Sequence, residues 1–226
     1  MGPWAHSYGA HLLCRSPGSI SPPAVAASRL KPPMDQTAKA ALREEASARR
    51  DTLTTAERER AAVSIAERAI DIAKAIRPRV LAAYMPIWSE VDCRPVISWA
   101  HDNDVAVVLP AVVDATALAF RLHRAGELLD AGRFGTQAPP AHAELATPDV
   151  LIAPMIAFDR TGARLGYGGG FYDREIARLR AEGHKPLLVG LAFAVQEVPA
   201  IPAESHDMRM DWIVTEKETL EFRRSE

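Results

Sequence analysis

The sequence predicts an α/β protein with a mainly parallel sheet that is covered by helices on both faces. Short apolar runs recur along the chain, helical patterns separate several of them, and turn residues bound both kinds of segment. Strands that are buried on both faces are apolar throughout, so this alternation is typical of a parallel sheet between two helical layers.

Two helices are expected before the first strand. Residues 35–50 favour helix, and Thr54 and Glu57 then form the sequence signature of a capping box that opens a second helix. Pro78 ends that helix. Apolar side chains recur along it at helical spacing, at Ile65, Ala69, Ile72 and Ile76. We expect this stripe to face the core.

The remaining elements are short. Strands are expected at residues 80–84, 105–109, 117–122, 150–153, 187–191 and 212–214, and helices at 95–102 and 171–182. Because ligands bind at the carboxyl ends of strands in such sheets, the loops that follow the strands are the first place to search for a functional site.

Length and composition are consistent with one domain, over residues 34–226, since 226 residues with 48% hydrophobic side chains can form a sizeable core. Residues 1–33 are rich in Gly, Pro, Ser and Ala and contain no acidic residue, so we expect a disordered N-terminal extension. A start codon placed before a true start at Met34 and an organelle transit segment both fit this extension.

Charge and cysteine content exclude several classes of function. A net charge of −2 and a pI near 6.4 favour neither nucleic acid nor an anionic membrane as a partner. Cys14 and Cys93 are the only cysteines, and their spacing favours neither a disulfide framework nor a zinc site. No apolar run approaches the roughly 18 residues of a membrane span. We expect a cytoplasmic monomer that acts on small molecules.

The most informative segment is a glycine run between Arg164 and Asp173. Gly166, Gly168, Gly169 and Gly170 precede the expected helix at 171–182. Bare backbone amides at a helix N-terminus attract phosphate. The run matches neither the Gly-x-Gly-x-x-Gly pattern nor a Walker loop. We favour a phosphate-binding loop, with a turn that serves only strand-to-helix packing as the alternative.

Two cations lie near the start of the expected domain. Lys39 and Arg43 are four residues apart, so on a helix their charges repel unless an anion lies between them. A triphosphate would relieve this repulsion. A solvated helix face balanced by Glu44 and Glu45 is the alternative.

Acidic side chains also occur in two other segments, one after an expected strand and one before the last expected strand. Trp88, Glu90 and Asp92 combine an aromatic plane with two carboxylates, which suits a stacked heterocycle that donates N–H bonds, although helix starts are often acidic too. Asp207 lies in a polar loop and could join Asp173 around one Mg²⁺. A simple turn-forming role is the alternative for such a loop Asp.

In their order along the chain, these motifs resemble those of the 5-formyltetrahydrofolate cyclo-ligase family, also called 5,10-methenyltetrahydrofolate synthetases. The resemblance spans about Lys39 to the end. It rests on Lys39-x-x-Leu-Arg43, Tyr84 with Glu90-Val91-Asp92, Leu109-Pro110, the segment Pro154 to Arg174 with its glycine run, Gln196 and Asp207. One departure is Gln137-Ala138-Pro139, where many members have Glu before Pro.

The resemblance implies a fold and a reaction. The fold would be a three-layer α/β/α sandwich similar to those of sugar-phosphate isomerases and CoA transferases. The reaction would convert 5-formyltetrahydrofolate into 5,10-methenyltetrahydrofolate with Mg²⁺ and ATP, releasing ADP and phosphate. Such enzymes are thought to phosphorylate the formyl oxygen, after which N10 attacks the activated carbon.

The resemblance also assigns residues to ligands. The implied catalytic residues are Arg164, Tyr172 and Asp173, and the implied Mg²⁺ ligands are Asp173 and Asp207. ATP would be bound by Lys39, Arg43, Arg164, Leu165, Gly166, Tyr167, Gly168, Gly169, Gly170, Phe171 and Tyr172. The folate would be bound by Ile87, Trp88, Glu90, Asp92, Tyr167, Gly168, Gly169, Gly170 and Phe171.

Two other classes of function stay open. A sugar-phosphate isomerase or CoA-transferase relative would need a further acid/base pair or a glutamyl nucleophile near the glycine run, and the sequence does not point to one. A noncatalytic folate or nucleotide sensor would keep the pocket without turnover.

Overall fold

The structure is a computed structural model that describes residues 34–202, 204 and 206–222. The expected extension over residues 1–33 lies outside the described residues. A seven-stranded sheet has the order β11-β10-β9-β6-β1-β2-β3. Its strands are β1 (Val80–Ala82), β2 (Ala106–Val112), β3 (Leu118–His123), β6 (Val150–Pro154), β9 (Leu187–Leu191), β10 (Trp212–Val214) and β11 (Thr219–Glu221). The helices are α1 (Met34–Asp51), α2 (Thr55–Ile76), α3 (Arg94–Asp102) and α4 (Phe171–Ala181).

The inner strands of the sheet are parallel, as predicted. β1 pairs in parallel with β2 and β6, and β9 does so with β6 and β10. The two edge strands, β3 and β11, are antiparallel to their neighbours.

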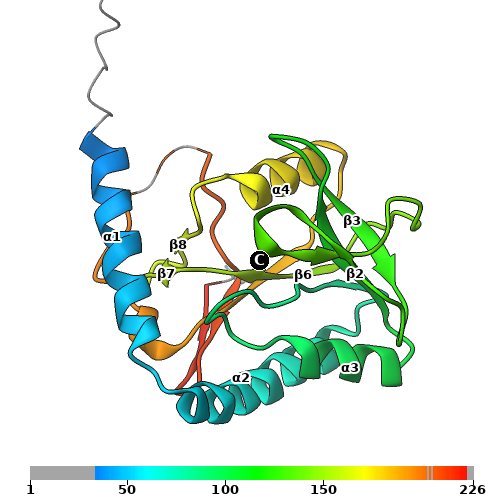
Figure 1. Cartoon of the computed structure of the whole chain (residues 1–226), viewed down its shortest axis with the longest axis horizontal. Helices are drawn as coiled ribbons and strands as arrows, with labels where there is room; N and C mark the ends of the chain where they lie inside the picture. The colour runs from blue at the N-terminus through cyan, green and yellow to red at the C-terminus, as the bar shows by residue number, and fades with distance from the viewer. Residues whose placement is uncertain (1–33, 203, 205, 223–226) are drawn as a thin grey trace, which may run out of the picture. The chain divides into compact units, whose positions relative to one another are not determined.

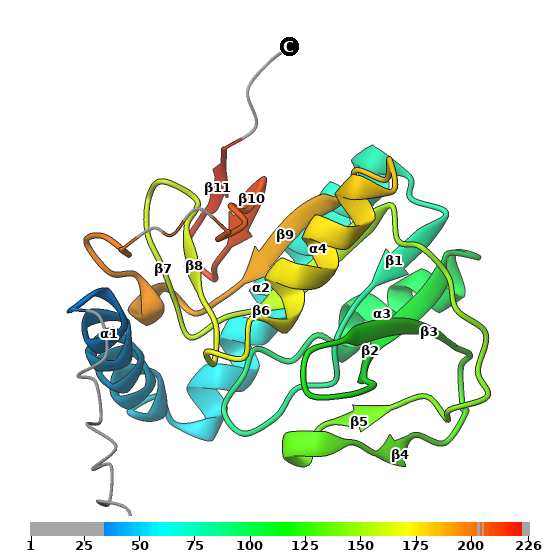
Figure 2. The same cartoon turned by 90° about the horizontal axis from the view of Figure 1, so that it is seen from above.

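Helices cover both faces of this sheet, with α2 and α3 on one face and α4 on the other (Figures 1 and 2). Side chains along β6 alternate between the two faces. Val150 and Ile152 belong to the core beneath α2 and α3, whereas Leu151 and Ala153 belong to the core beneath α4. The predicted three-layer sandwich is therefore confirmed.

Helix α2 begins with the predicted capping box. The Thr54 hydroxyl accepts a hydrogen bond from the Glu57 amide at 3.3 Å, and the Glu57 carboxylate accepts one from the Thr54 amide at 2.8 Å. Ile65 and Ala69 of the predicted stripe are buried.

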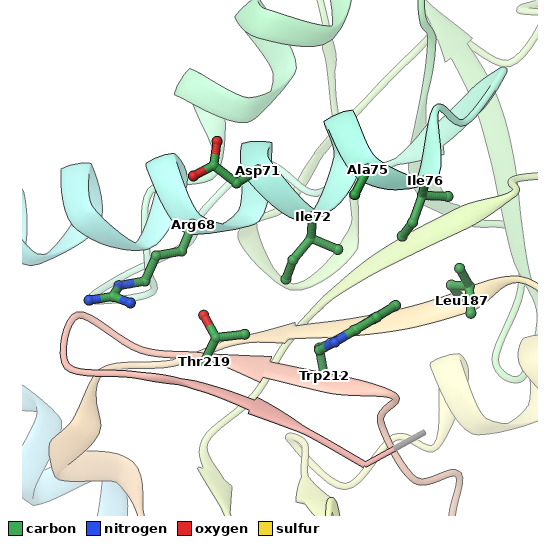
Figure 3. Close-up of a pocket in the computed structure, with 8 residues that line it drawn as sticks. All are labelled: Arg68, Asp71, Ile72, Ala75, Ile76, Leu187, Trp212 and Thr219. Atoms are coloured by element: carbon green, nitrogen blue, oxygen red, sulfur yellow. The ribbon is translucent and has the colours of Figure 1, made fainter. Parts of the chain in front are cut away.

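Ile72 and Ile76 are only partly buried, because they lie over a cavity of about 670 Å³ between α2 and strands β9, β10 and β11 (Figure 3). The stripe therefore faces the core along most of the helix and a groove near its end.

The structure contains several elements that the sequence pattern did not predict. β1 ends at Ala82, so the expected strand over residues 80–84 is too long. The unpredicted elements include β11, a 3₁₀ turn at Ala194–Gln196, and β4 (Asp130–Ala131), β5 (Gln137–Ala138), β7 (Ala157–Phe158) and β8 (Arg164–Leu165). A further 3₁₀ turn, at Arg133–Gly135, lies in a segment whose sequence is typical of a turn.

Helix α1 packs against the small β7–β8 sheet and against the 3₁₀ turn at Ala194–Gln196 (Figure 1). Ala46 of α1 is buried in a cluster with Ala157 of β7 and Leu165 of β8, and Leu42 packs against it. This packing sets the first helix beside the strand that leads into the glycine run. In the described part of the chain, no helix has the length and apolar character needed to cross a membrane.

Candidate active site

The glycine run forms the loop between β8 and α4. Gly168 has a φ of +94° and Gly170 a φ of +64°, which side chains rarely adopt. Gly170 is the N-cap of α4 and has no side chain to cap the first-turn amides. The start of α4 is therefore suited to an anion.

This loop lines a cavity of about 1020 Å³ together with α1 and the segment around residues 204–208. Pro154, the last residue of β6, also lines it, so the cavity lies at the carboxyl end of a central strand. Every residue expected to bind ATP is on its wall: Lys39, Arg43, Arg164, Leu165, Gly166, Tyr167, Gly168, Gly169, Gly170, Phe171 and Tyr172. Asp173 and Asp207, expected to hold the metal, line it too.

Arg164 and Asp173 form an ion pair in the wall of the cavity. The Arg164 side chain is 4% exposed, and its Nη2 donates to Asp173 Oδ1 at 2.9 Å. The Met208 amide donates to the same oxygen at 3.1 Å. The Arg164 guanidinium also lies 5.6 Å from the ring centre of Tyr172, whose pKa is raised by burial. Tyr172 is therefore a neutral hydroxyl at physiological pH.

Arg43 is bound to the glycine loop itself. Its Nε donates to the carbonyl of Gly166 at 2.8 Å. A Cβ atom on Gly168 would lie 3.4 Å from the Arg43 Cζ, so the guanidinium lies close against the loop backbone. A positive charge on α1 is thus fixed beside the bare amides.

Lys39 binds the two acidic side chains of the segment around residues 204–208. Its Nζ lies 2.7 Å from Asp207 Oδ2 and 3.0 Å from Glu204 Oε2. Burial acts to raise the pKa of Asp207, but the hydrogen bonds from Lys39 and the Glu204 amide outweigh it and lower that pKa. The pKa of Lys39 is raised by the same pairing, against the effect of burial.

Asp207 is therefore paired with Lys39, and the structure shows no contact between it and Asp173. Oxygen and nitrogen ligands of Glu204, His206 and Asp207 lie within 4.8 Å of one another, and this group does not include Asp173. Asp173 and Asp207 thus line the same cavity, and their joint binding of one Mg²⁺ ion stays a prediction.

Three of the residues expected to bind folate line a second cavity of about 480 Å³, which is bounded by the start of α2, whereas Tyr167 to Phe171 line the first one. Trp88, Glu90 and Asp92 lie on the wall of the second cavity, as does Gln137. Ile87 is not on that wall, and its amide donates to Glu90 Oε2 at 2.9 Å. Both Asp92 oxygens accept from the Arg94 guanidinium, at 2.8 and 2.7 Å, and these bonds lower the pKa of Asp92 despite its burial.

Tyr167 connects the two cavities. It lines the first one, while its hydroxyl donates to Glu90 Oε1 at 2.8 Å and its ring centre lies 5.4 Å from that of Trp88. Burial raises the pKa of Glu90, and the bonds from the Ile87 amide and Tyr167 partly offset this. Trp88 is 74% exposed and has a φ of +52°, an uncommon conformation for a large side chain.

Arg50, at the end of α1, is a site residue that the sequence interpretation missed. Only 3% of it is exposed, and its guanidinium contacts the hydroxyls of Ser89 at 2.9 Å and Tyr167 at 3.4 Å. A basic residue in the last turn of a helix is ordinary, so the local pattern gives no signal for this role.

Gln196, which formed part of the resemblance, has a structural role in the described residues. It is 1% exposed, and its amide nitrogen donates to the carbonyls of Met155 and Ile156 at 2.7 and 2.9 Å. These bonds fix the turn that follows β6.

Together, the sheet and the cavity define an α/β protein with a cationic, glycine-lined ligand cavity at the carboxyl end of a central strand. The model of the 5-formyltetrahydrofolate cyclo-ligase family matches residues 35–216. The chain belongs to this family and is an enzyme of the cyclo-ligase type.

Individual relatives agree with this assignment. A 5-formyltetrahydrofolate cyclo-ligase of Escherichia coli K12 is 29% identical over 181 residues, which cover 77% of this chain and 98% of the relative. The Mycolicibacterium smegmatis cyclo-ligase is 34% identical over 151 residues, covering 63% of this chain and 76% of the relative.

A solved structure has the same fold. The Aquifex aeolicus 5,10-methenyltetrahydrofolate synthetase superimposes with a TM-score of 0.72 at 28% identity, covering 83% of this chain and 94% of that one.

Proposed function

We propose that the chain converts 5-formyltetrahydrofolate into 5,10-methenyltetrahydrofolate, using ATP with Mg²⁺ and releasing ADP and phosphate. One observation carries this proposal: a single cavity gathers Lys39 and Arg43 of α1 with the glycine loop and its flanking Arg164–Asp173 pair, from two parts of the chain that are far apart in sequence. Such a wall suits a polyanion, and the family membership names the reaction of its relatives.

The chemistry explains why a phosphate site is needed. The oxygen of a formamide is a poor leaving group. Its attack on the γ-phosphorus breaks the bond to the bridging oxygen of ADP and gives an imidate phosphate. N10 then attacks the imidate carbon and loses its proton, and the C–O bond breaks as phosphate leaves.

The residues of the cavity contribute position and positive charge, which are the main requirements of phosphoryl transfer. In our proposal the loop amides and Arg43 hold the phosphates, and Arg164 stabilises the charge that develops during transfer. The Arg164 Nε is buried and has no hydrogen-bond partner in the described part of the chain, and a phosphate oxygen would provide an acceptor.

The donor chemistry fits Mg²⁺. Carboxylate oxygens are the ligands that this ion prefers, and Asp173 and Asp207 supply them on the wall of the cavity. Both contacts to Asp173 use Oδ1. Bound there, Mg²⁺ would neutralise charge on the phosphates.

The second cavity is the proposed folate side. Trp88 offers a stacking face, and Glu90 and Asp92 offer acceptors for the amino and ring N–H groups of a pterin. Because Tyr167 contacts Trp88 and Glu90 while lining the other cavity, it is suited to hold the formyl group near the γ-phosphate.

The appearance of the methenyl chromophore tests this function. Purified enzyme with 5-formyltetrahydrofolate, ATP and Mg²⁺ should form it, and omission of ATP should abolish it. Isomerase activity without ATP would favour a sugar-phosphate isomerase relative. Tight folate binding with no ATP consumption would favour a sensor, and either result contradicts the proposal.

The metal role has its own test. Asp173→Asn should raise the Mg²⁺ concentration needed for half-maximal activity about tenfold or more, because one ligand charge is lost. Asp211→Asn is the matched control, since Asp211 bonds the Leu188 amide within the sheet region and does not line the cavity. Equal Mg²⁺ dependence of Asp173→Asn and wild type would contradict this role.

The proposal also includes the location and assembly of the enzyme: it acts in the cytoplasm as a monomer and has no nucleic-acid partner.

A further inference from the structure

Arg50 is a buried cation that lines neither cavity, but it contacts Tyr167, which lines the first one, and Ser89, which is adjacent in sequence to Glu90 on the wall of the second. Arg50 comes from the end of α1. Its Nε bonds Ser89, in the acidic segment that includes Glu90, and its Nη1 bonds Tyr167, in the glycine loop. One side chain thus connects the two sets of proposed ligand-binding residues.

The direction of these hydrogen bonds follows from donor chemistry. A guanidinium can only donate, so the hydroxyl oxygens of Ser89 and Tyr167 must accept from Arg50. Each hydroxyl has one proton left to donate, and each gives it to a carboxylate: Tyr167 to Glu90 at 2.8 Å, and Ser89 to Asp51 at 2.5 Å.

The buried charge therefore lies near two acids: Arg50 Nε is 4.0 Å from Asp51 Oδ1, and the Tyr167 hydroxyl connects the guanidinium to Glu90. This arrangement leaves Glu90 as an acceptor of hydrogen bonds. Its Oε1 accepts from Tyr167 and its Oε2 from the Ile87 amide. The positive charge of Arg50 acts in the same sense, because it lowers the pKa of Glu90 against the effect of burial. An ionised Glu90 is the state that can accept N–H groups from a bound heterocycle.

We propose that Arg50 is a positioning residue for the folate: it fixes the Tyr167 hydroxyl and, through it, the Glu90 carboxylate. The inference rests on the proposed function, since it concerns binding of the same substrate. It concerns the folate side alone, because the phosphate-binding residues Lys39, Arg43 and Arg164 have their own contacts.

The test is a double-mutant cycle with Arg50→Met and Tyr167→Phe. Each single variant should raise the KM for 5-formyltetrahydrofolate about tenfold, and Arg50→Met should change the KM for ATP less than twofold. Because both act on Glu90 by one route, the double variant should show no more than the larger single effect. Single effects that multiply in the double variant would overturn the proposal.

Control variants separate positioning from folding. Arg49→Met is the matched control, because Arg49 is the next residue on α1 and bonds the Glu197 carbonyl instead. It should leave both KM values unchanged. Arg50→Lys keeps the charge without the planar fork and should restore part of the folate affinity. If Arg50→Met lowered the melting temperature but left the ratio of the KM for 5-formyltetrahydrofolate to the KM for ATP at its wild-type value, Arg50 would have only a structural role.

Folate affinity is also measured by calorimetry without ATP, so the inference does not depend on turnover. A wild-type enzyme that binds 5-formyltetrahydrofolate but forms no methenyl product would contradict the proposed reaction alone. Equal folate affinities of wild type, Arg50→Lys and Tyr167→Phe would contradict the role of Arg50, even if Arg50→Met failed to fold.

Discussion

At the scale of single residues, the cavity is built from charge pairs. Arg164 holds Asp173, and Lys39 holds Asp207. The sequence indicated which residue types gather around a phosphate, and a metal ion shared by Asp173 and Asp207 stays a prediction. It did not indicate that Lys39 bonds Asp207, because these residues are 168 positions apart and no local pattern encodes such a pairing.

Arg164→Ala should lower kcat by about 100-fold, because the proposed stabilisation of transferring phosphate is lost from a buried site. Asp173 then keeps its hydrogen bond from the Met208 amide, at 3.1 Å, but loses its positively charged partner. The chromophore assay measures the effect, and circular dichroism checks the fold. Arg160→Ala is the control, because Arg160 pairs with Glu197 and Glu218 on the surface and should leave kcat unchanged. A normal kcat for Arg164→Ala would contradict its assignment.

Asp207 makes stability depend on pH. Its pKa is lowered in the folded protein, chiefly because the bonds from Lys39 and the Glu204 amide exceed the effect of burial. The pairing therefore stabilises the fold fully above the unfolded pKa of about 3.9 and is lost as pH falls through the folded value.

Urea unfolding of wild type and Asp207→Asn from pH 6 to pH 3 measures this contribution. The difference in their free energies of unfolding should shrink below about pH 4. A constant difference across that range would show that the carboxylate is not stabilised by its partners.

At the scale of elements, most of the long helices and apolar strands could be predicted from sequence. Periodicity and the Thr54 capping box defined α2, and buried apolar runs defined β6 and β9. The two-residue strands could not be predicted, because a period of two needs more residues to be visible. β1 is shorter than its apolar run. Ala83 and Tyr84 lie beyond the end of the strand but are still buried, so an apolar pattern does not show where the strand ends.

The capping box offers a test that should not affect the active site. Thr54→Ala should destabilise the protein by about 1 kcal/mol, because an amide of the first turn loses its acceptor. Chemical denaturation measures the change, and kinetic constants should stay at wild-type values. Ser64→Ala, inside the same helix, should cost nothing, since Ala is the better helix former. Equal stability of Thr54→Ala and wild type would contradict the energetic role of the cap.

At the scale of the whole molecule, the residues of the candidate site are brought together by tertiary packing that no local sequence pattern indicates. Every residue that the ordered motifs assigned to ATP lines the larger cavity, and Trp88, Glu90 and Asp92 of the residues assigned to folate line the second one. The motifs did not predict that α1 would pack on the β7–β8 sheet, or that Arg50 would connect the two cavities through Tyr167. Both depend on tertiary contacts between distant segments.

Cys93 can report on the integrity of the main core. Burial raises the pKa of its thiol to about 12, so only about one molecule in ten thousand has the reactive thiolate at pH 8. In a Cys14→Ser background, a thiol reagent should label the native protein far more slowly than the urea-unfolded protein. Labelling at similar rates would show that the core around Cys93 opens readily.

The pairing of Lys39 with Glu204 and Asp207 has a consequence for biosynthesis. A nascent chain leaves the ribosome with α1 first, and the acidic partners of Lys39 follow 165 and 168 residues later. Until that late segment emerges, the lysine lacks the two carboxylates that bind it in the folded protein, and one wall of the proposed nucleotide cavity is missing. Translation intermediates stalled before residue 204 should therefore be unable to retain nucleotide, which places the acquisition of binding at the end of synthesis.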